Sequence, residues 1–528
     1  MPATIHRRSL LAATPLWAAT SPAHAADALP DPLRIAFSDP VSSLDPQLNN
    51  NAGDRSVDMF FFDFLVQNNE NALQPGLATE WRATSPTTWD FSLRQGVRWH
   101  DGTPFTADDV LFSYARAPNV PGSVASFASF LRSIATVEAP TPLSIRITTH
   151  EPNPLLPQNL ASIHVVSRHV GEHATSEDYN TGKALVGTGP FRFVAYTPGA
   201  SIQMRRNDQY WGDKPLWPRV DYRYVGNPAA RTAALLANDV DVIDKVSTAD
   251  VAKLRDNPAI RLYPYPGLRV LVLQPSFNPA SNRYATAPDG KPLERNPLSD
   301  VRVRRALNVA INRPALADRL MQGTVNAASQ MMPEGTFGYD PAIPMPAYDP
   351  EGAKKLLAEA GHPQGFNLTF HIPVDRYVSG SEVAQAVAQM WTRIGVRTTI
   401  EPLTWTLYQS RVNKAEFAMT MIAWGNGTAE SSYGILNILA TQDAARGQGV
   451  SNWGHYASPV VDRALDQAIS TFDDAKREAI LRGAARQVEA DVAILPLFHY
   501  QNIWAARRGL VVRPQSSDRT LATMVRPQ

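Results

Sequence analysis

Apolar and polar residues alternate one by one around Trp89, and this alternation predicts a β-strand. Trp89, Phe91 and Leu93 are separated by polar residues, a period of two that is typical of a half-buried strand. Gln95-Gly96 then predicts a turn, and residues 97–99 lead the chain into a second turn. The segment therefore predicts a β-hairpin.

A helix is predicted directly after this hairpin. Thr106 is a residue type that caps helices, and Asp108 and Asp109 follow it where the positive end of the helix dipole favours acids. Val110 and Tyr114, one turn apart, belong to its apolar side. The whole module has the character of a structural unit, because it contains no catalytic arrangement of side chains.

The second half of the chain alternates helical and strand-like patterns. Helices are predicted at 300–312, from Asp349-Pro350 to Gly361, and in a segment that ends at Gly395, with strands at 367–370 and 396–400. A strand, a helix and a strand over about 35 residues form a crossover unit, which implies an α/β lobe.

Two apolar runs that end in polar residues are candidates for passages between lobes. They are 269–278 and 493–504, and the roughly 220 residues between them are enough for one complete lobe. Periodicity alone thus predicts two α/β lobes.

Composition excludes several classes of function. The chain has 528 residues, a formal net charge of +1 and no cysteine. A near-neutral protein lacks the concentrated basic face that nucleic-acid binding needs. Without cysteine there are no disulfides, no thiolate catalysis and no lipid-modified cysteine as a membrane anchor. No apolar run reaches the roughly 20 residues of a membrane span.

The N-terminus has the pattern of an export signal. Arg7-Arg8 precedes a modest apolar segment, and Ala23-His24-Ala25 places small residues at the two positions that a signal peptidase reads. A signal peptide over residues 1–25, cleaved before Ala26, is therefore expected. The paired arginines favour the twin-arginine route, although general secretory signals also carry two positive charges.

Motifs for catalysis or metal binding are missing. The sequence contains no HExxH, GxSxG, SxxK or Walker pattern. His164, His169 and His173 have no acid or thiolate that completes a familiar metal site, so surface histidines are the better interpretation. We therefore expect no enzyme activity, no cofactor and no metal.

Loops that follow predicted strands combine aromatic and polar residues, as a binding cleft requires. Two such loops follow the strands ending near Ile372 and Ile422, and a third comes after a glycine-rich stretch. The alternative for the tryptophans is core packing, and for the arginine a plain surface position. The ligand-binding candidates, including one from the second crossing run, are Arg376, Tyr377, Trp424, Asn426, Glu430, Tyr433, Trp453 and Tyr500.

Several segments resemble one protein family. The segment 77–114, Gly187-Thr188-Gly189-Pro190-Phe191, residues 207–215 and residues 231–242 are similar to motifs of the extracellular solute-binding proteins of family 5, the dipeptide- and oligopeptide-binding components of ATP-driven (ABC) importers. The resemblance implies a two-lobe α/β periplasmic binding protein fold, with mixed sheets flanked by helices, an extra subdomain in the first lobe and two hinge crossings. The implied units are 26–270 for lobe 1 with its subdomain, 271–497 for lobe 2 and 498–528 for the return to lobe 1.

The resemblance also implies roles for individual residues. Asp39 lies in the loop that the first strand would deliver to the cleft, and Arg376 matches an arginine that lines the peptide site of dipeptide-binding relatives. Peptide binders carry an aspartate, which pairs with the α-amino group of the ligand, three residues after the cleft tryptophan. Here that position is Gly427. Either Glu430 replaces the aspartate or the ligand lacks a free peptide amine, because an unpaired buried ammonium is costly.

These features together predict a periplasmic receptor that closes around a peptide or similar small polar solute and hands it to an ABC permease. It is expected to be a monomer with no membrane anchor and no nucleic-acid partner. The alternatives are a receptor for a metal chelate, an opine, glutathione or an oligosaccharide, and a periplasmic chaperone, sensor partner or hydrolase on the same scaffold.

Overall fold

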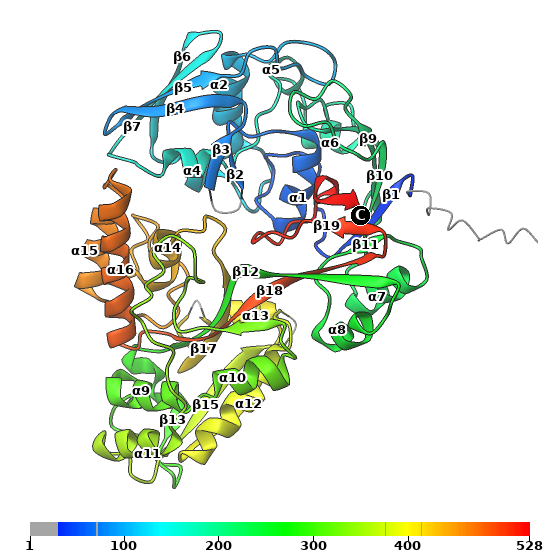
Figure 1. Ribbon diagram of the computed structural model, residues 1–528. Helices are drawn as coiled ribbons and strands as arrows, with labels where there is room; N and C mark the ends of the chain where they lie inside the picture. The colour runs from blue at the N-terminus through cyan, green and yellow to red at the C-terminus, as the bar shows by residue number, and fades with distance from the viewer. Residues whose placement is uncertain (1–29, 70–71, 375, 413) are drawn as a thin grey trace, which may run out of the picture.

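The computed structural model describes residues 30–69, 72–374, 376–412 and 414–528. They fold into two lobes joined by a pair of long strands (Figure 1). The predicted signal peptide over 1–25 and its cleavage before Ala26 lie outside the described residues. Within the described ranges, none of the helices combines the length and the apolar character that a membrane span requires.

In the main sheet of the described residues, neighbouring strands pair in the order β13-β15-β17-β12-β18-β11-β1-β10-β9-β8. Two further strands lie off this order, since β14 pairs with β18 and β16 pairs with β15. Its first-lobe strands are β1 (Leu33–Phe37), β8 (Phe191–Thr197), β9 (Ser201–Arg206), β10 (Arg219–Tyr224) and β11 (Val242–Ile243). The helices next to them in the chain are α1 (Ala52–Phe61), α5 (Arg168–Gly171), α6 (Ser176–Asn180), α7 (Pro228–Leu236) and α8 (Thr248–Arg255). The last strands, β19 (Leu510–Val512) and β20 (Val525–Pro527), return to this lobe (Figure 1).

A subdomain is inserted in the first lobe. It contains a separate antiparallel sheet in the order β4-β5-β7-β6 and its own apolar core, in which Phe91, Trp99 and Val110 are buried. Its elements are β2 (Val66–Asn69), β3 (Ala72–Pro75), β4 (Ala78–Ser85), β5 (Thr88–Leu93), β6 (Ile134–Thr141), β7 (Ser144–Thr149), α2 (Ala107–Arg116), α3 (Ala128–Leu131) and α4 (Leu156–Leu160).

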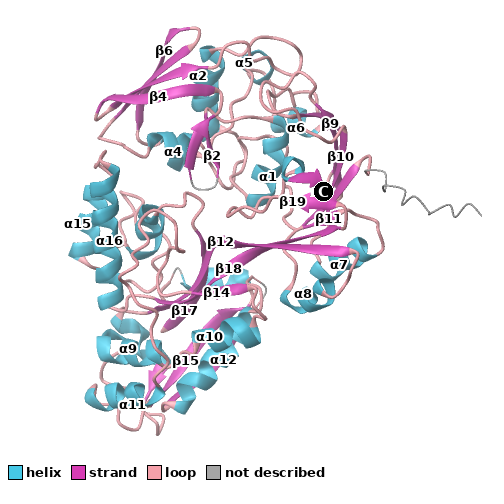
Figure 2. Cartoon of the chain, viewed as in Figure 1, coloured by secondary structure: helices cyan, strands magenta, loops and turns pink. Residues whose placement is uncertain are grey.

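Helices flank the mixed sheet of the second lobe (Figure 2). Its strands are β13 (Ala285–Thr286), β14 (Val325–Ala327), β15 (Phe366–Pro373), β16 (Val396–Leu403) and β17 (Met419–Gly425). Its helices are α9 (Val301–Val309), α10 (Arg313–Ala315), α11 (Pro350–Glu359), α12 (Gly380–Arg393), α13 (Trp405–Val412), α14 (Ser431–Gly434), α15 (Pro459–Ala468) and α16 (Asp474–Ala490). β15 and β16 pair in parallel, and α12 connects them, which confirms the predicted crossover unit.

The two lobes are connected by β12 (Ile260–Pro275) and β18 (Leu495–Arg507), which pair with each other antiparallel. β18 also pairs with β11 in the first lobe and with β14 in the second. Both predicted crossing runs therefore lie in long shared strands. The ladder between β12 and β18 is interrupted between Pro266 and Val270, and the predicted boundaries at 270 and 497 lie near this interruption and stay predictions.

Two local expectations were wrong. The hairpin partner of β5 is the preceding strand β4, with Trp81 opposite Phe91, whereas residues 97–99 bond to residues 103–105, with Arg98 opposite Pro104. The longer segment 78–85 offers β5 more backbone partners than three residues between two turns can. His164 is fully buried, and its ring stacks on Phe64 at 4.0 Å between centroids, so it is no surface histidine.

Candidate functional site

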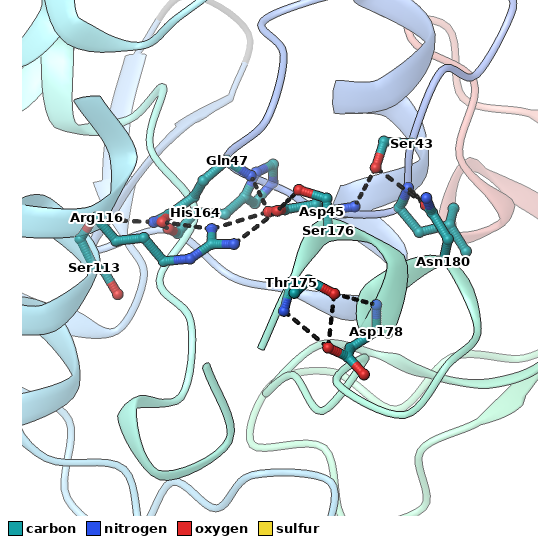
Figure 3. A network of polar contacts seen from close by, with 11 residues as sticks. Ser43, Asp45, Gln47, Ser113, Arg116, His164, Thr175, Ser176, Asp178 and Asn180 are labelled. Atoms are coloured by element: carbon teal, nitrogen blue, oxygen red, sulfur yellow. Dashed lines mark hydrogen bonds and ion pairs between the residues drawn. The ribbon is translucent and has the colours of Figure 1, made fainter. Parts of the chain in front are cut away.

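A loop between β1 and α1 is held firmly on the first lobe, and this fixes where α1 begins (Figure 3). Arg116 donates to both carboxylate oxygens of Asp45, at 2.9 and 2.7 Å, and Ser176 donates to the same carboxylate at 2.7 Å. Asn180 Oδ1 accepts the backbone N–H of Leu44 at 2.8 Å. Charge-assisted bonds of this kind are stronger than neutral ones, so the loop is firmly attached to the first lobe.

One cavity between the lobes has a volume of about 430 Å³. Arg55 and Met59 of α1 line it from the first lobe, whereas Leu268, Gly427 and Thr428 line it from β12 and from the loop after β17. Ligand sites of binding proteins are concave and mostly preformed, and this cavity has walls from both lobes.

A second cavity, of about 530 Å³, lies beside the first and shares Gln158 and Thr428 with it. Gln158 Nε2 donates to the backbone carbonyl of Thr428 at 2.5 Å and so bridges the lobes. The predicted candidates Glu430 and Tyr433 line this second cavity.

Trp424 and Tyr433 come together, with their ring centroids 5.4 Å apart. Among the described residues the indole Nε1 of Trp424 is buried without a hydrogen-bond partner. Trp424 and Tyr433, two of the predicted aromatic candidates, are thus in contact.

A second aromatic group lies where α12 and α13 begin. Arg376 is exposed, and its guanidinium lies 5.3 Å from the ring centroid of Trp405. Tyr377 meets the same ring edge-on at 6.1 Å, and burial raises the pKa of Tyr377 to about 12. Tyr500 donates to the backbone carbonyl of Val378 at 3.3 Å. Arg376, Tyr377 and Tyr500 are therefore neighbours.

A chain of charges lies near the crossing strands. Lys245 Nζ is 2.6 Å from Asp39 Oδ2 and 3.7 Å from Asp518, which in turn is 3.6 Å from Arg269. Burial opposes ionisation of Asp518, but Lys245, Arg269 and Arg519 outweigh it and lower the pKa of Asp518 to about 2. The predicted candidate Asp39 is thus already paired with a lysine.

Three predicted candidates have structural partners. Glu430 accepts from Arg477 at 3.0 Å and from Ser432 at 2.9 Å. Asn426 is fully buried and donates to the backbone carbonyl of Glu430 at 3.1 Å. Trp453 packs against Tyr408 at 6.1 Å, inside an apolar core of the second lobe. Burial raises the pKa of Glu430, and Arg477 opposes this rise.

Sequence reasoning missed several residues of this region, namely Arg55, Lys245, Arg269, Trp405, Asp518 and Arg519. Arg55 and Met59 are four residues apart, so helical spacing gives a weak signal that they share a face. Trp405 reaches Arg376 through the parallel pairing of β15 with β16. The remaining residues come together where the crossing strands meet the C-terminal segment, an arrangement that no local pattern contains.

Comparison with known proteins identifies similar chains. Residues 72–446 match the sequence profile of the bacterial extracellular solute-binding proteins, family 5, in its middle part. The chain is 29% identical over 455 residues to heme-binding protein A of Haemophilus influenzae, covering 81% of this chain and 79% of that protein. It is 27% identical over 469 residues to the dipeptide-binding protein of Escherichia coli, covering 83% and 84%.

Among solved structures, that of HbpA2 from Haemophilus parasuis superposes with a TM-score of 0.81 and 23% sequence identity. The superposition covers 94% of this chain and 99% of that chain. This likeness shows that the two proteins share a fold.

Proposed function

Because the chain belongs to the bacterial extracellular solute-binding proteins, family 5, we propose that it is the periplasmic receptor of an ABC importer. It closes around a small polar solute and delivers this solute to the membrane permease. The observation that carries the proposal is the 430 Å³ cavity, whose walls come from both lobes beside the crossing strands. Lobes joined by a hinge can close over a ligand, and such closure is driven by the higher ligand affinity of the closed state.

The family consists of solute-binding proteins of ABC transporters, so the expectation that the chain is no enzyme is confirmed. The hydrolase alternative is therefore dropped. A chaperone role stays as the second candidate, and the test below separates it from transport.

A solute without a free peptide amine fits the cleft better than a peptide does. Gly427 offers no carboxylate, and Glu430 already pairs with Arg477 in a buried position. Removing Glu430 from this pair would leave the buried guanidinium of Arg477 with only the exposed Asp474 as its acid, which is unfavourable. The proposed solute is thus small and polar, and it places its own acid against a cleft arginine such as Arg376.

Native mass spectrometry of the protein purified from the periplasm tests the receptor role. We expect one small solute bound per chain and a monomeric protein. A protein without any bound solute that instead retains long unfolded chains would support the chaperone. Cell fractionation tests the proposed export, since a full-length chain in the cytoplasm would contradict cleavage before Ala26.

A further inference from the structure

The wall of the 430 Å³ cavity carries an excess of positive charge. Arg55, Arg513 and Arg519 line it, together with Asp63 and Asp213. Asp63 is buried and accepts hydrogen bonds from Thr188, Tyr210 and Trp211, at 2.8, 3.1 and 2.8 Å, whereas Asp213 is exposed. The carboxylate of Asp63 is therefore engaged within the first lobe.

The position of Arg55 and Arg519 follows from α1. Arg55, Met59 and Phe62 lie on one side of this helix and its end, and all three line the cavity. Arg519 Nη1 lies 3.2 Å from the Sδ atom of Met59. Met59 lies one helical turn after Arg55 in α1. The two arginines therefore approach the cavity side by side, one from α1 and one from the C-terminal segment.

The guanidinium of Arg55 lacks a full set of partners among the described residues. Arg55 Nη1 donates to Asn50 Oδ1 at 2.9 Å, whereas its Nε is buried without a hydrogen-bond partner among the described residues. Burial lowers the pKa of Arg55 to about 9, and the positive charge of Arg519 acts in the same direction. Arg55 is partly buried, and a partly buried cation without a paired acid is unfavourable. Arg55 is therefore suited to a negative group that comes from elsewhere.

The neighbouring acids form no ion pair or hydrogen bond with these arginines among the described residues. Both carboxyl oxygens of Asp58 are buried without a hydrogen-bond partner there, and burial raises the pKa of Asp58 well above its usual range. Asp518 lies next to Arg519 in the chain, but it faces Lys245 and Arg269.

Gly427 leaves open space in the cavity that the two arginines line. A Cβ added to Gly427 would meet no atom within 4 Å, and the glycine lines the same cavity. In the peptide binders that this chain resembles, this position holds the aspartate that pairs with the ligand's α-amino group. Gly427 itself brings no carboxylate to this cavity, which Arg55 and Arg519 also line.

We propose that the cavity between Arg55, Arg519 and Gly427 binds an anionic group of the solute, a carboxylate or a phosphate. The proposal rests on the receptor function proposed above and specifies its solute as a molecule with negative charge at the end where a peptide has its amine. Guanidinium groups suit this role because they bind both oxyanions through paired N–H donors.

A pair of variants at Gly427 tests the charge of this cavity. Gly427→Asp places a carboxylate beside the arginines, and Gly427→Asn places an uncharged group of the same size there. Calorimetry is done with succinate, citrate, inorganic phosphate and the dipeptide Ala-Ala. We expect anions to bind the natural protein, the aspartate variant to lose about tenfold or more in anion affinity, and the asparagine variant to lose much less.

Removing the arginines gives a second readout. Arg55→Gln with Arg519→Gln is compared with Arg255→Gln and Arg393→Gln, two exposed arginines whose loss changes the net charge equally. We expect only the first pair to weaken anion binding, again by about tenfold or more, with thermal melting confirming that each variant is folded. Succinate and citrate report on carboxylates, and inorganic phosphate reports on phosphates.

Several outcomes would overturn the anion site. They are binding of Ala-Ala but of no anion, binding of none of the four probes, equal losses in both Gly427 variants, and unchanged anion affinity without Arg55 and Arg519. If a co-purified solute binds the double variant as tightly as the natural protein, the receptor function stands and only the anion site fails. If no solute is bound at all, the proposed function fails first.

Discussion

The role of a residue in this protein depends on partners that only the folded chain supplies. Arg376 and Tyr377 were predicted from their place after a strand, and they do lie together on Trp405. Glu430 was predicted from its place in a loop, yet Arg477, distant in sequence, holds its carboxylate. The position of a residue after a strand is a local property that the sequence shows. Whether its charge is already paired depends on residues distant in sequence. The sequence therefore predicts which loops follow strands better than it predicts which side chains remain available to a ligand.

At the same scale, Arg376→Ala should weaken the binding of a carboxylate-bearing solute by about 2–4 kcal/mol, because a guanidinium–carboxylate pair is lost. Calorimetry with the co-purified solute measures the change. Arg393→Ala, which removes an exposed arginine at the end of α12, is the matched control. Unchanged affinity in the Arg376 variant would remove this residue from the site.

Asp244 gives the stability of the first lobe a defined pH dependence. It is buried, 3.6 Å from Arg231, and burial raises its pKa to about 6. Because an unfolded aspartate has a pKa of about 3.9, the folded state binds the proton more tightly, and the free energy of unfolding falls by about 2–3 kcal/mol as the pH rises from about 4 to above 6. This contribution is complete below the unfolded pKa and is lost above the folded one.

Asp244→Asn should remove this part of the pH dependence, since the amide does not ionise. Urea unfolding of both proteins across that pH range gives the difference between their free energies of unfolding. The contributions of the other acids are the same in both proteins and cancel in this difference. Curves that stay parallel at every pH would show that Asp244 does not titrate as described.

At the scale of elements, the predicted helices and strands were largely confirmed where a local signal marks both ends. Asp349 caps α11 by accepting the backbone N–H of Gly352, and Gly361 follows the helix with a φ of 88°. Asn238 takes the left-handed conformation that its place after α7 predicted, with a φ of 64°. α1 was not predicted, and neither was the partner of β5, because long-range pairing and burial decide both.

The start of α1 is packed against the loop that follows β1. A Cβ on Gly53 would lie 2.1 Å from the backbone oxygen of Pro40, whereas one on Gly483, within α16, would meet nothing within 4 Å. Gly53→Ala should therefore lower the free energy of unfolding by about 1–3 kcal/mol, because backbone must move. Gly483→Ala should raise it by about 0.5–1 kcal/mol through helix propensity alone. Thermal melting of both variants checks the opposite signs, and equal shifts would contradict the close contact.

At the scale of the whole molecule, the two lobes also touch outside the lining of the 430 Å³ cavity. The ring of Trp89 in the first-lobe subdomain stacks on Phe472 of the second lobe, with centroids 5.9 Å apart. Arg132 also donates to the backbone carbonyl of Arg446 at 3.4 Å. These contacts exist only while the lobes are close, so they stabilise the closed form.

Phe472→Ala should therefore weaken solute binding although Phe472 lies outside the cavity lining. We expect a loss of about 0.5–1.5 kcal/mol, the size of an aromatic pair, and a more open solute-free protein in small-angle scattering. Val460→Ala, on the exposed side of α15, is the control. Unchanged affinity and unchanged scattering would show that this contact does not bias closure.

The first lobe is completed by residues from late in the chain. Trp217 donates to the backbone carbonyl of Val525 at 2.7 Å, Tyr222 donates to that of Thr520 at 2.9 Å, and Trp504 is buried in the same apolar core as Leu33. Leu33 therefore leaves the ribosome long before Trp504 and Val525, which belong to the same apolar core, have been synthesised. Until translation reaches Val525, the nascent protein holds an unfinished core, so the first lobe completes its packing only when nearly the whole chain has been synthesised.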